Sequence, residues 1–286
     1  MAALGTDRAA ADLSYQSVDA DGVPARIYRP AGEAADALLW AHGGGFVHGD
    51  LDMPEADWVA RSLAGRGHLV VSVDYRLATE TVRYPEPSND ILAAWHWFTR
   101  QRDALGVDGP LHLGGASAGG NLVTGAVVRM RDGDPVARGA ALPHTLVLAY
   151  PTLHAVQPQA SEELARLLLN LPEESRWDAE QVLAMYVGFL QHDDGASASE
   201  IVRAAPAAAV PGEADLKDFP PTLILTSEAD GLRASAEAFD SRLGTAGIEH
   251  EYFIEPGTLH GHLNRPHEPG ALPTLERMHA WLTNHR

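Results

Sequence analysis

The chain has 286 residues, of which 45% are hydrophobic, enough to form one large domain with its own core. Its 21 Lys and Arg residues face 39 Asp and Glu residues, and the formal charge of -18 at pH 7 opposes binding to nucleic acids or anionic lipid surfaces. The absence of cysteine excludes disulfides, thiolate metal sites and a cysteine nucleophile.

The start of the chain has no features of a targeting segment. Residues 1–14 contain neither the basic region nor the apolar region of a signal peptide. No apolar run approaches the roughly 20 residues that a transmembrane helix needs. We therefore expect a soluble, cytoplasmic protein that does not insert into membranes.

The predicted elements begin with a hairpin. Apolar residues alternate at 15–18 and 23–28, on either side of the turn dipeptide Asp21-Gly22. Later apolar runs do not alternate, which is typical of parallel strands buried on both faces: 37–42, 69–75, 111–115, 145–150 and 222–227, with a further strand at 250–255. Segments whose apolar residues recur at helical spacing lie between or after these strands, at 55–64, 88–104, 118–131, 232–246 and 272–284. The alternation predicts an α/β fold with a mostly parallel central sheet flanked by helices.

One interval interrupts this alternation. Between Pro151 and about Pro211 the sequence has no strand candidate, only two helix-like pieces at 161–170 and 177–191 followed by a stretch of small residues. A long insertion in a regular α/β pattern is more often functional than part of the core. We therefore predict a single domain over residues 1–286, with a small helical lid, or cap, inserted at about 152–210.

Ser117 is the candidate nucleophile. It stands in Gly-Ala-Ser-Ala-Gly at 115–119, directly after a predicted strand and before a predicted helix. At such a turn the serine backbone is strained, and small neighbours allow the chain to turn tightly enough to expose the hydroxyl. Composition alone would produce roughly 0.1 such pentapeptides, so the pattern needs support from elsewhere in the chain.

That support comes from the sequence His-Gly-Gly-Gly-Phe at 42–46, which follows another predicted strand. Acyl transfer through a serine creates a tetrahedral oxyanion, and glycines let backbone amides approach its negative oxygen. We expect an oxyanion hole formed by Gly43, Gly44 and Gly45 together with the amide of Ala118, the residue after the nucleophile.

A serine nucleophile also needs a base and an acid that orients the base, in the chain order serine, acid, histidine for this type of fold. Asp230 follows the strand at 222–227 and is the preferred acid, with Glu228 as its rival. Among the 14 histidines, His260 lies in a loop before the last helix and is the preferred base, with His262 second.

These segments resemble the hormone-sensitive-lipase-like family of α/β-hydrolases, bacterial esterases sometimes called family IV. The resemblance spans nearly the whole chain and rests on HGGGF (42–46), VSVDYRLA (71–78), YPEPSND (84–90), GASAGGN (115–121), ADGLR (229–233) and LHGH (259–262). It implies the α/β-hydrolase fold, the same triad and the same oxyanion donors.

The chain departs from the family pattern at several positions. Members usually have Asp or Thr where this chain has Ala116, and often have Pro where it has Gly231. Fewer residues precede the glycine-rich segment than the family usually has, so we expect a shortened N-terminal part of the lid. The insertion at 152–210 must then supply most of the cover over the site.

The resemblance implies a serine carboxylesterase acting on small or short-chain esters, without a metal or organic cofactor. Phe46, Tyr186 and His262 are candidates for contact with the small-molecule substrate. An amidase of the arylformamidase type is the alternative enzyme, and a small-molecule binding protein without turnover is the alternative of another class. A homodimer is possible by resemblance.

Overall fold

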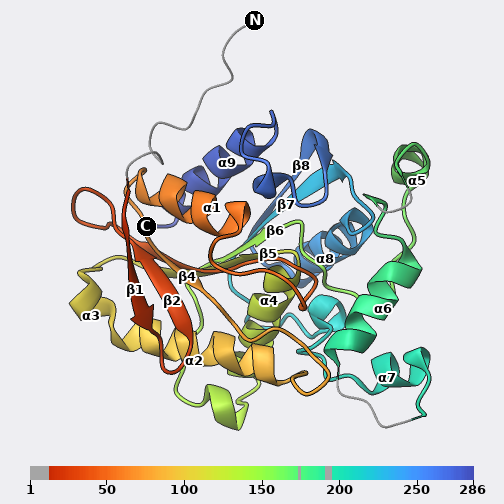
Figure 1. Ribbon diagram of the computed structural model, residues 1–286, viewed down its shortest axis with the longest axis horizontal. Coiled ribbons are helices and arrows are strands. Elements are labelled where there is room, and N and C mark those ends of the chain that lie inside the picture. Colours follow the sequence, from red (N-terminus) through yellow and green to blue (C-terminus); the bar gives the residue numbers. More distant parts are fainter. Residues whose placement is uncertain (1–12, 173–174, 191–194) are drawn as a thin grey trace, which may run out of the picture.

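One eight-stranded sheet runs through the centre of the molecule (Figure 1). The computed structural model describes residues 13–172, 175–190 and 195–286. Most of the N-terminal segment, for which we expected no targeting signal, therefore lies outside the described residues. The strands are β1 (Tyr15–Asp19), β2 (Pro24–Tyr28), β3 (Ala37–Ala41), β4 (Leu69–Val73), β5 (Leu111–Ala116), β6 (Leu146–Ala149), β7 (Thr222–Ala229) and β8 (His250–Leu259).

The sheet joins an antiparallel edge to a parallel body. Its strand order is β1-β2-β4-β3-β5-β6-β7-β8, with β1 antiparallel to β2, β2 antiparallel to β4, and every other neighbouring pair parallel. Asp21 and Gly22 of the hairpin turn have φ values of 58° and 89°, a conformation that favours Asp-Gly pairs. The predicted hairpin and mostly parallel sheet are confirmed.

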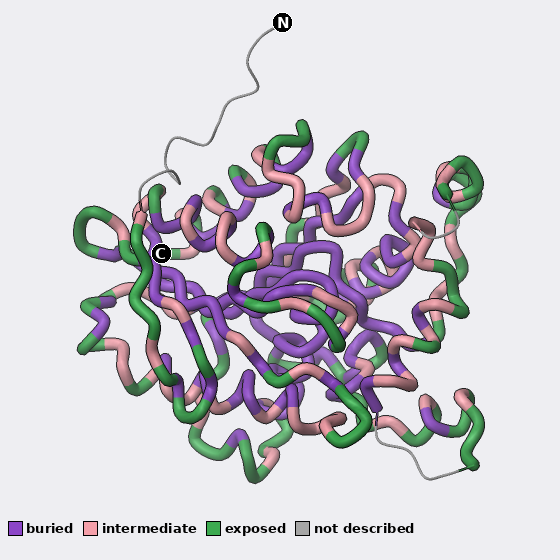
Figure 2. The backbone as a smooth tube through the Cα atoms, in the orientation of Figure 1, coloured by how far each residue is buried: buried purple, intermediate pink, exposed green. Residues whose placement is uncertain are grey.

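Helices cover both faces of the sheet because its central strands are apolar on both sides. In β3, Leu38 and Trp40 pack into one buried cluster with α1 (Pro54–Ala64) and α9 (Ala271–Asn284). Leu39 and Ala41 pack into the other cluster with α2 (Glu86–Arg100), α4 (Ala118–Arg131) and α8 (Arg233–Ala246). Figure 2 shows the buried sheet at the centre with exposure concentrated at the rim. The other α-helices of the described residues are α3 (Arg102–Leu105), α5 (Glu162–Leu169), α6 (Ala179–Phe189) and α7 (Ala198–Ala204).

The insertion is helical in the residues that the structure describes between 152 and 210. They form α5, α6 and α7 without a strand, and the three helices gather on one side of the molecule (Figure 1). α7 was not predicted, although its sequence carries a signal: Ser197 and Glu200 form a capping box. The helix predicted at 88–104 is divided into α2 and α3. No helix in the described part of the chain is long and apolar enough to cross a membrane.

The strand order places the functional segments. β3 lies between β4 and β5, and Ala41 pairs with Gly115, so the loop after β3 and the turn after β5 leave the sheet side by side. β7 and β8 are also neighbours, and Ala229 pairs with Leu259. The residues immediately after that pair are Asp230 and His260.

Candidate active site

Ser117 occupies a tight turn between β5 and α4. Its φ of 50° is unusual for a residue with a side chain, and such strain costs on the order of 1–3 kcal/mol. A Cβ atom on Gly119 would lie 2.2 Å from the carbonyl oxygen of Ala41, and one on Gly115 would lie 2.6 Å from the carbonyl carbon of Gly119. The two glycines therefore allow the turn to close against β3, which presents the serine hydroxyl at the end of the sheet.

The three residues expected to form the triad lie in one hydrogen-bonded row. Ser117 Oγ is 3.1 Å from His260 Nε2, and His260 Nδ1 is 2.8 Å from Asp230 Oδ2. The Asp230 side chain is buried, and its second oxygen accepts a 2.9 Å hydrogen bond from the Leu232 amide. Both carboxylate oxygens are thus satisfied, and the imidazole is held between acid and hydroxyl.

The rival residues have other partners. Glu228 Oε2 accepts a 2.8 Å hydrogen bond from the Gly257 amide. The His262 ring is buried between the hydroxyls of Ser227, at 2.8 Å, and Thr274, at 2.7 Å. Burial lowers the pKa of His262 to about 4, so its ring is neutral at pH 7. Neither Glu228 nor His262 takes a place in the row formed by the triad.

The glycine-rich loop borders Ser117, but its three amides differ in availability. The Gly43 amide donates to Glu55 Oε2 at 2.8 Å, so its predicted role as an oxyanion donor is corrected. In the described part of the chain, no acceptor is found for the amides of Gly44, Gly45 or Ala118. Gly44 and Gly45 have φ values of 120° and 60°, a backbone that favours glycine. The remaining candidate donors are therefore Gly44, Gly45 and Ala118.

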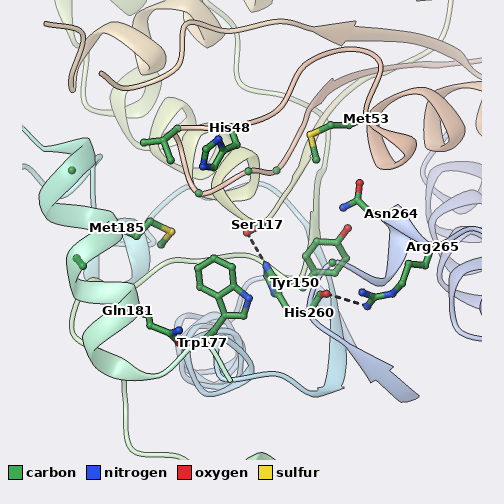
Figure 3. Close-up of a pocket in the computed structure, with 17 residues that line it drawn as sticks. His48, Met53, Ser117, Tyr150, Trp177, Gln181, Met185, His260, Asn264 and Arg265 are labelled. Atoms are coloured by element: carbon green, nitrogen blue, oxygen red, sulfur yellow. Dashed lines mark hydrogen bonds between the residues drawn. The ribbon is translucent and has the colours of Figure 1, made fainter. Parts of the chain in front are cut away.

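Aromatic rings enclose the candidate base. The rings of Trp177 and Tyr150 lie edge-on to His260, with centroid distances of 5.2 and 5.1 Å. Arg265 donates to the His260 carbonyl at 3.2 Å, on the side away from Trp177 (Figure 3). These contacts hold the backbone and the ring of His260 while leaving its Nε2 atom toward Ser117.

A cavity of about 630 Å³ opens over the Ser117 hydroxyl. Four of its residues lie on one face of α6 at helical spacing: Gln181, Ala184, Met185 and Gly188. The remaining lining comes from the glycine-rich loop, the residues after it, and the loop around the candidate base: Gly43, Gly44, Gly45, Val47, His48, Met53, Ser117, Tyr150, Trp177, His260, Gly261, Asn264 and Arg265. Figure 3 shows α6 and the glycine-rich loop on two sides of Ser117.

The residues expected to contact substrate do not line this cavity. Phe46 is fully buried and stacks on Phe189 with ring centroids 4.0 Å apart. The Tyr186 hydroxyl accepts from Asn121 and donates to the Thr152 carbonyl, at 2.8 and 3.0 Å. Phe46, Tyr186 and His262 are therefore buried outside the cavity lining, and the expectation that they contact the substrate directly is corrected.

The cavity-facing side of α6 was not predicted, although the 3–4 residue spacing of its members is visible in the sequence. The packing around Gly231 gives a physical reason for its departure from the family pattern. A Cβ atom on Gly231 would lie 2.2 Å from the Trp177 carbonyl oxygen. The loop after β7 thus packs directly against the segment before α6. This close approach is the physical reason why glycine stands there.

Comparisons with known proteins identify the family and its esterase relatives. A profile for the alpha/beta hydrolase fold matches residues 38–264, which include the glycine-rich loop and the candidate triad. The ethyl acetate hydrolase of Pseudomonas putida is 31% identical over 87% of this chain and 74% of its own length. The carboxylesterase NlhH of Mycobacterium tuberculosis is 34% identical, with coverages of 88% and 76%. The solved structure of EstE1, a thermostable carboxylesterase from a metagenomic library, has a TM-score of 0.77 and 27% identity, covering 96% of this chain and 89% of that one.

Proposed function

This chain belongs to the alpha/beta hydrolase family, in its hormone-sensitive-lipase-like branch, and is a carboxylic ester hydrolase; on that premise we propose that it cleaves small or short-chain esters through an acyl-enzyme on Ser117. The observation that carries the proposal is the hydrogen-bonded row of Ser117, His260 and Asp230, of which Ser117 and His260 line a mostly apolar cavity. Free backbone amides beside the serine complete the set of groups that acyl transfer needs.

The first half of the reaction forms the acyl-enzyme. As Ser117 Oγ attacks the ester carbonyl carbon, its proton passes to His260 Nε2. Asp230 accepts the hydrogen bond from Nδ1 and stabilises the positive charge on the ring. The carbonyl oxygen becomes an oxyanion, held by Ala118 at the start of α4 and by the glycine-rich loop. When the ester C–O bond breaks, His260 returns the proton to the leaving alcohol.

The second half repeats these roles with water. His260 takes a proton from a water molecule as its oxygen attacks the acyl carbon on Ser117. Collapse of the second oxyanion releases the carboxylic acid and returns the proton to Ser117 Oγ. The histidine serves both halves from one position, since its Nδ1 stays hydrogen-bonded to Asp230.

The cavity limits the substrate class. Its volume of about 630 Å³ falls within the range of small-molecule sites, and its walls carry apolar side chains such as Met53, Trp177 and Met185. Within the predicted lid, Trp177 and α6 supply one side of this cavity, which supports a covering role for the insertion. We keep a cytoplasmic location and a homodimer as predictions, which fractionation and sedimentation velocity would test.

The deciding experiment compares the wild type with Ser117→Ala, using a fluorophosphonate probe and short-chain p-nitrophenyl esters. We expect covalent labelling and most turnover to be lost, with a kcat reduction of about 10⁴-fold or more. Ser199→Ala, at an exposed position on α7, is the matched control and keeps both signals. Wild-type turnover by the Ser117→Ala variant would disprove the proposal.

A parallel assay tests the amidase alternative. We expect the wild type to hydrolyse an aryl acetate faster than an N-formyl aryl amine. Labelling of Ser117 with turnover of the formamide but not of the acetate would replace the esterase by an amidase. Absence of labelling in the folded wild type would favour the binding protein.

A further inference from the structure

Glu55 is a buried acid whose role neither the sequence nor the triad chemistry explains. It lies in the first turn of α1 and its side chain is fully buried. Its Oε1 atom accepts a 2.5 Å hydrogen bond from Trp40 Nε1, and its Oε2 atom accepts a 2.8 Å hydrogen bond from the Gly43 amide. A buried carboxyl group is costly unless it is well hydrogen-bonded, and Glu55 meets this condition through donors on β3 and on the loop that follows it.

The bond to Gly43 acts on the part of the glycine-rich loop nearest the nucleophile. A Cβ atom on Gly43 would lie 3.3 Å from Ser117 Cβ, so this residue packs directly against the candidate nucleophile. Holding its amide fixes the orientation of the peptide that precedes Gly44 and Gly45. Because hydrogen-bond strength depends steeply on geometry, rotation of that peptide would move the two following amides away from the oxyanion.

The main chain of Glu55 contacts the other side of the site. Its amide donates to Asn264 Oδ1 at 3.2 Å. Asn264 lines the cavity beside the loop of His260, as Figure 3 shows. Glu55 therefore bonds to the glycine-rich loop through its side chain and to Asn264, beside the loop of the candidate base, through its backbone amide.

We propose that Glu55 is the positioning residue of the oxyanion hole, holding Gly43 so that the amides of Gly44 and Gly45 face the oxyanion formed at Ser117. This inference rests on the proposed esterase function. Glu55 is not among the residues that line the cavity, and its side chain acts on the oxyanion hole through Gly43.

The chemistry of the two partners explains why the position holds a carboxylate. Trp40 Nε1 and the Gly43 amide are both donors, and a carboxylate offers an acceptor oxygen to each. Glutamine has one acceptor oxygen, so its NH₂ group would face one of the two donors. Burial raises the pKa of Glu55, whereas the hydrogen bond from Gly43 and the adjacent start of α1 favour the charged form.

The test is Glu55→Gln, measured with an ester and with two inhibitors of the same shape. A trifluoromethyl ketone adds to Ser117 and forms an oxyanion, whereas the corresponding alcohol binds without one. We expect kcat and the affinity for the ketone to fall together by about 10- to 100-fold, with KM and the affinity for the alcohol changed by less than about 3-fold. A merely structural role would not separate the two inhibitors.

Two further variants control the result. Asp57→Asn removes another carboxylate of α1, which bonds to Tyr28 and Arg61 and not to the loop; we expect no separation of the two inhibitors. Trp40→Phe leaves Glu55 Oε1 without its donor, so the carboxyl group holds Gly43 less firmly, and we expect the same separation in smaller measure. If Glu55→Gln fails to fold, Trp40→Phe alone decides.

Equal loss of both inhibitors, or loss of neither, in the folded Glu55→Gln variant would overturn the inference, and so would an equal separation in Asp57→Asn. These outcomes differ from failure of the proposed function. The proposed function would fail if the wild type formed no covalent adduct with the ketone, or if Ser117→Ala retained full turnover.

Discussion

Asp230 and Glu228 show how residues two positions apart in one strand end acquire different roles. β7 pairs with β8 up to Ala229 and Leu259, and the next residue on each strand enters the row that ends at Ser117. Glu228 instead accepts a hydrogen bond from the Gly257 amide. The sequence identified both acids as candidates, but the register of the two strands distinguishes them.

Replacing Asp230 by asparagine tests this assignment. The amide group keeps the shape of the side chain but favours the wrong tautomer of His260, so we expect kcat to fall by about 10³- to 10⁴-fold with the fold retained. Steady-state hydrolysis of p-nitrophenyl acetate measures the loss. Glu228→Gln is the control, with an expected change in kcat of less than about 3-fold. A similar loss in both variants would contradict the assignment of the acid.

At the scale of elements, α6 controls the width of the cavity. Its residues at i, i+3, i+4 and i+7 face the site, whereas Val182, Tyr186 and Phe189 are buried against the body of the domain. One helix therefore carries a binding face and a packing face. The small side chains of Ala184 and Gly188 leave room that larger residues would fill.

Ala184→Leu narrows the cavity, and Ala179→Leu makes the same change at an exposed position of α6 outside its lining. We expect Ala184→Leu to lower kcat/KM for p-nitrophenyl octanoate by about 10-fold or more, with a much smaller effect on the acetate, because only the longer chain needs the filled volume. Ala179→Leu should leave the ratio of the two substrates unchanged. An unchanged ratio of kcat/KM for the two esters in Ala184→Leu would mean that α6 does not contact the acyl chain of the substrate.

For the whole molecule, two buried histidines make stability depend on pH. Burial lowers the pKa of His112 to about 3 and that of His262 to about 4, against about 6.5 for an unfolded histidine. Below pH 6.5 the unfolded chain binds protons that these rings do not bind in the folded state. Their contribution to stability is therefore complete above pH 6.5 and is lost progressively as the pH falls toward 4 and 3.

Each histidine contributes a slope of about 1.4 kcal/mol per pH unit to the free energy of unfolding between roughly pH 6 and its folded pKa. His112 hydrogen-bonds the Thr145 hydroxyl at 2.8 Å, and a glutamine in its place keeps a polar group without titrating. Urea unfolding of His112→Gln between pH 4.5 and 6.5 should show a slope smaller by about that amount. His267→Gln, at an exposed position, is the matched control. A slope equal to that of the wild type would refute the assignment of a neutral buried ring.

The sequence by itself determined the features that depend on neighbouring residues. Apolar runs buried on both faces indicated the parallel strands, and the glycines around Ser117 indicated the tight turn, because backbone conformation and solvent exposure are encoded over a few positions. α7 was missed although its capping signal was also local.

Only the tertiary structure decided which side chains meet across distant segments. In the folded chain the Gly43 amide donates to Glu55, the Tyr186 side chain lies in the core, and Ala184 and Met185 line the cavity. These contacts depend on strand register, on the rotation of α6 and on the packing of α1 against β3. None of these can be read from a short stretch of sequence, because each follows from how the whole chain fills its interior.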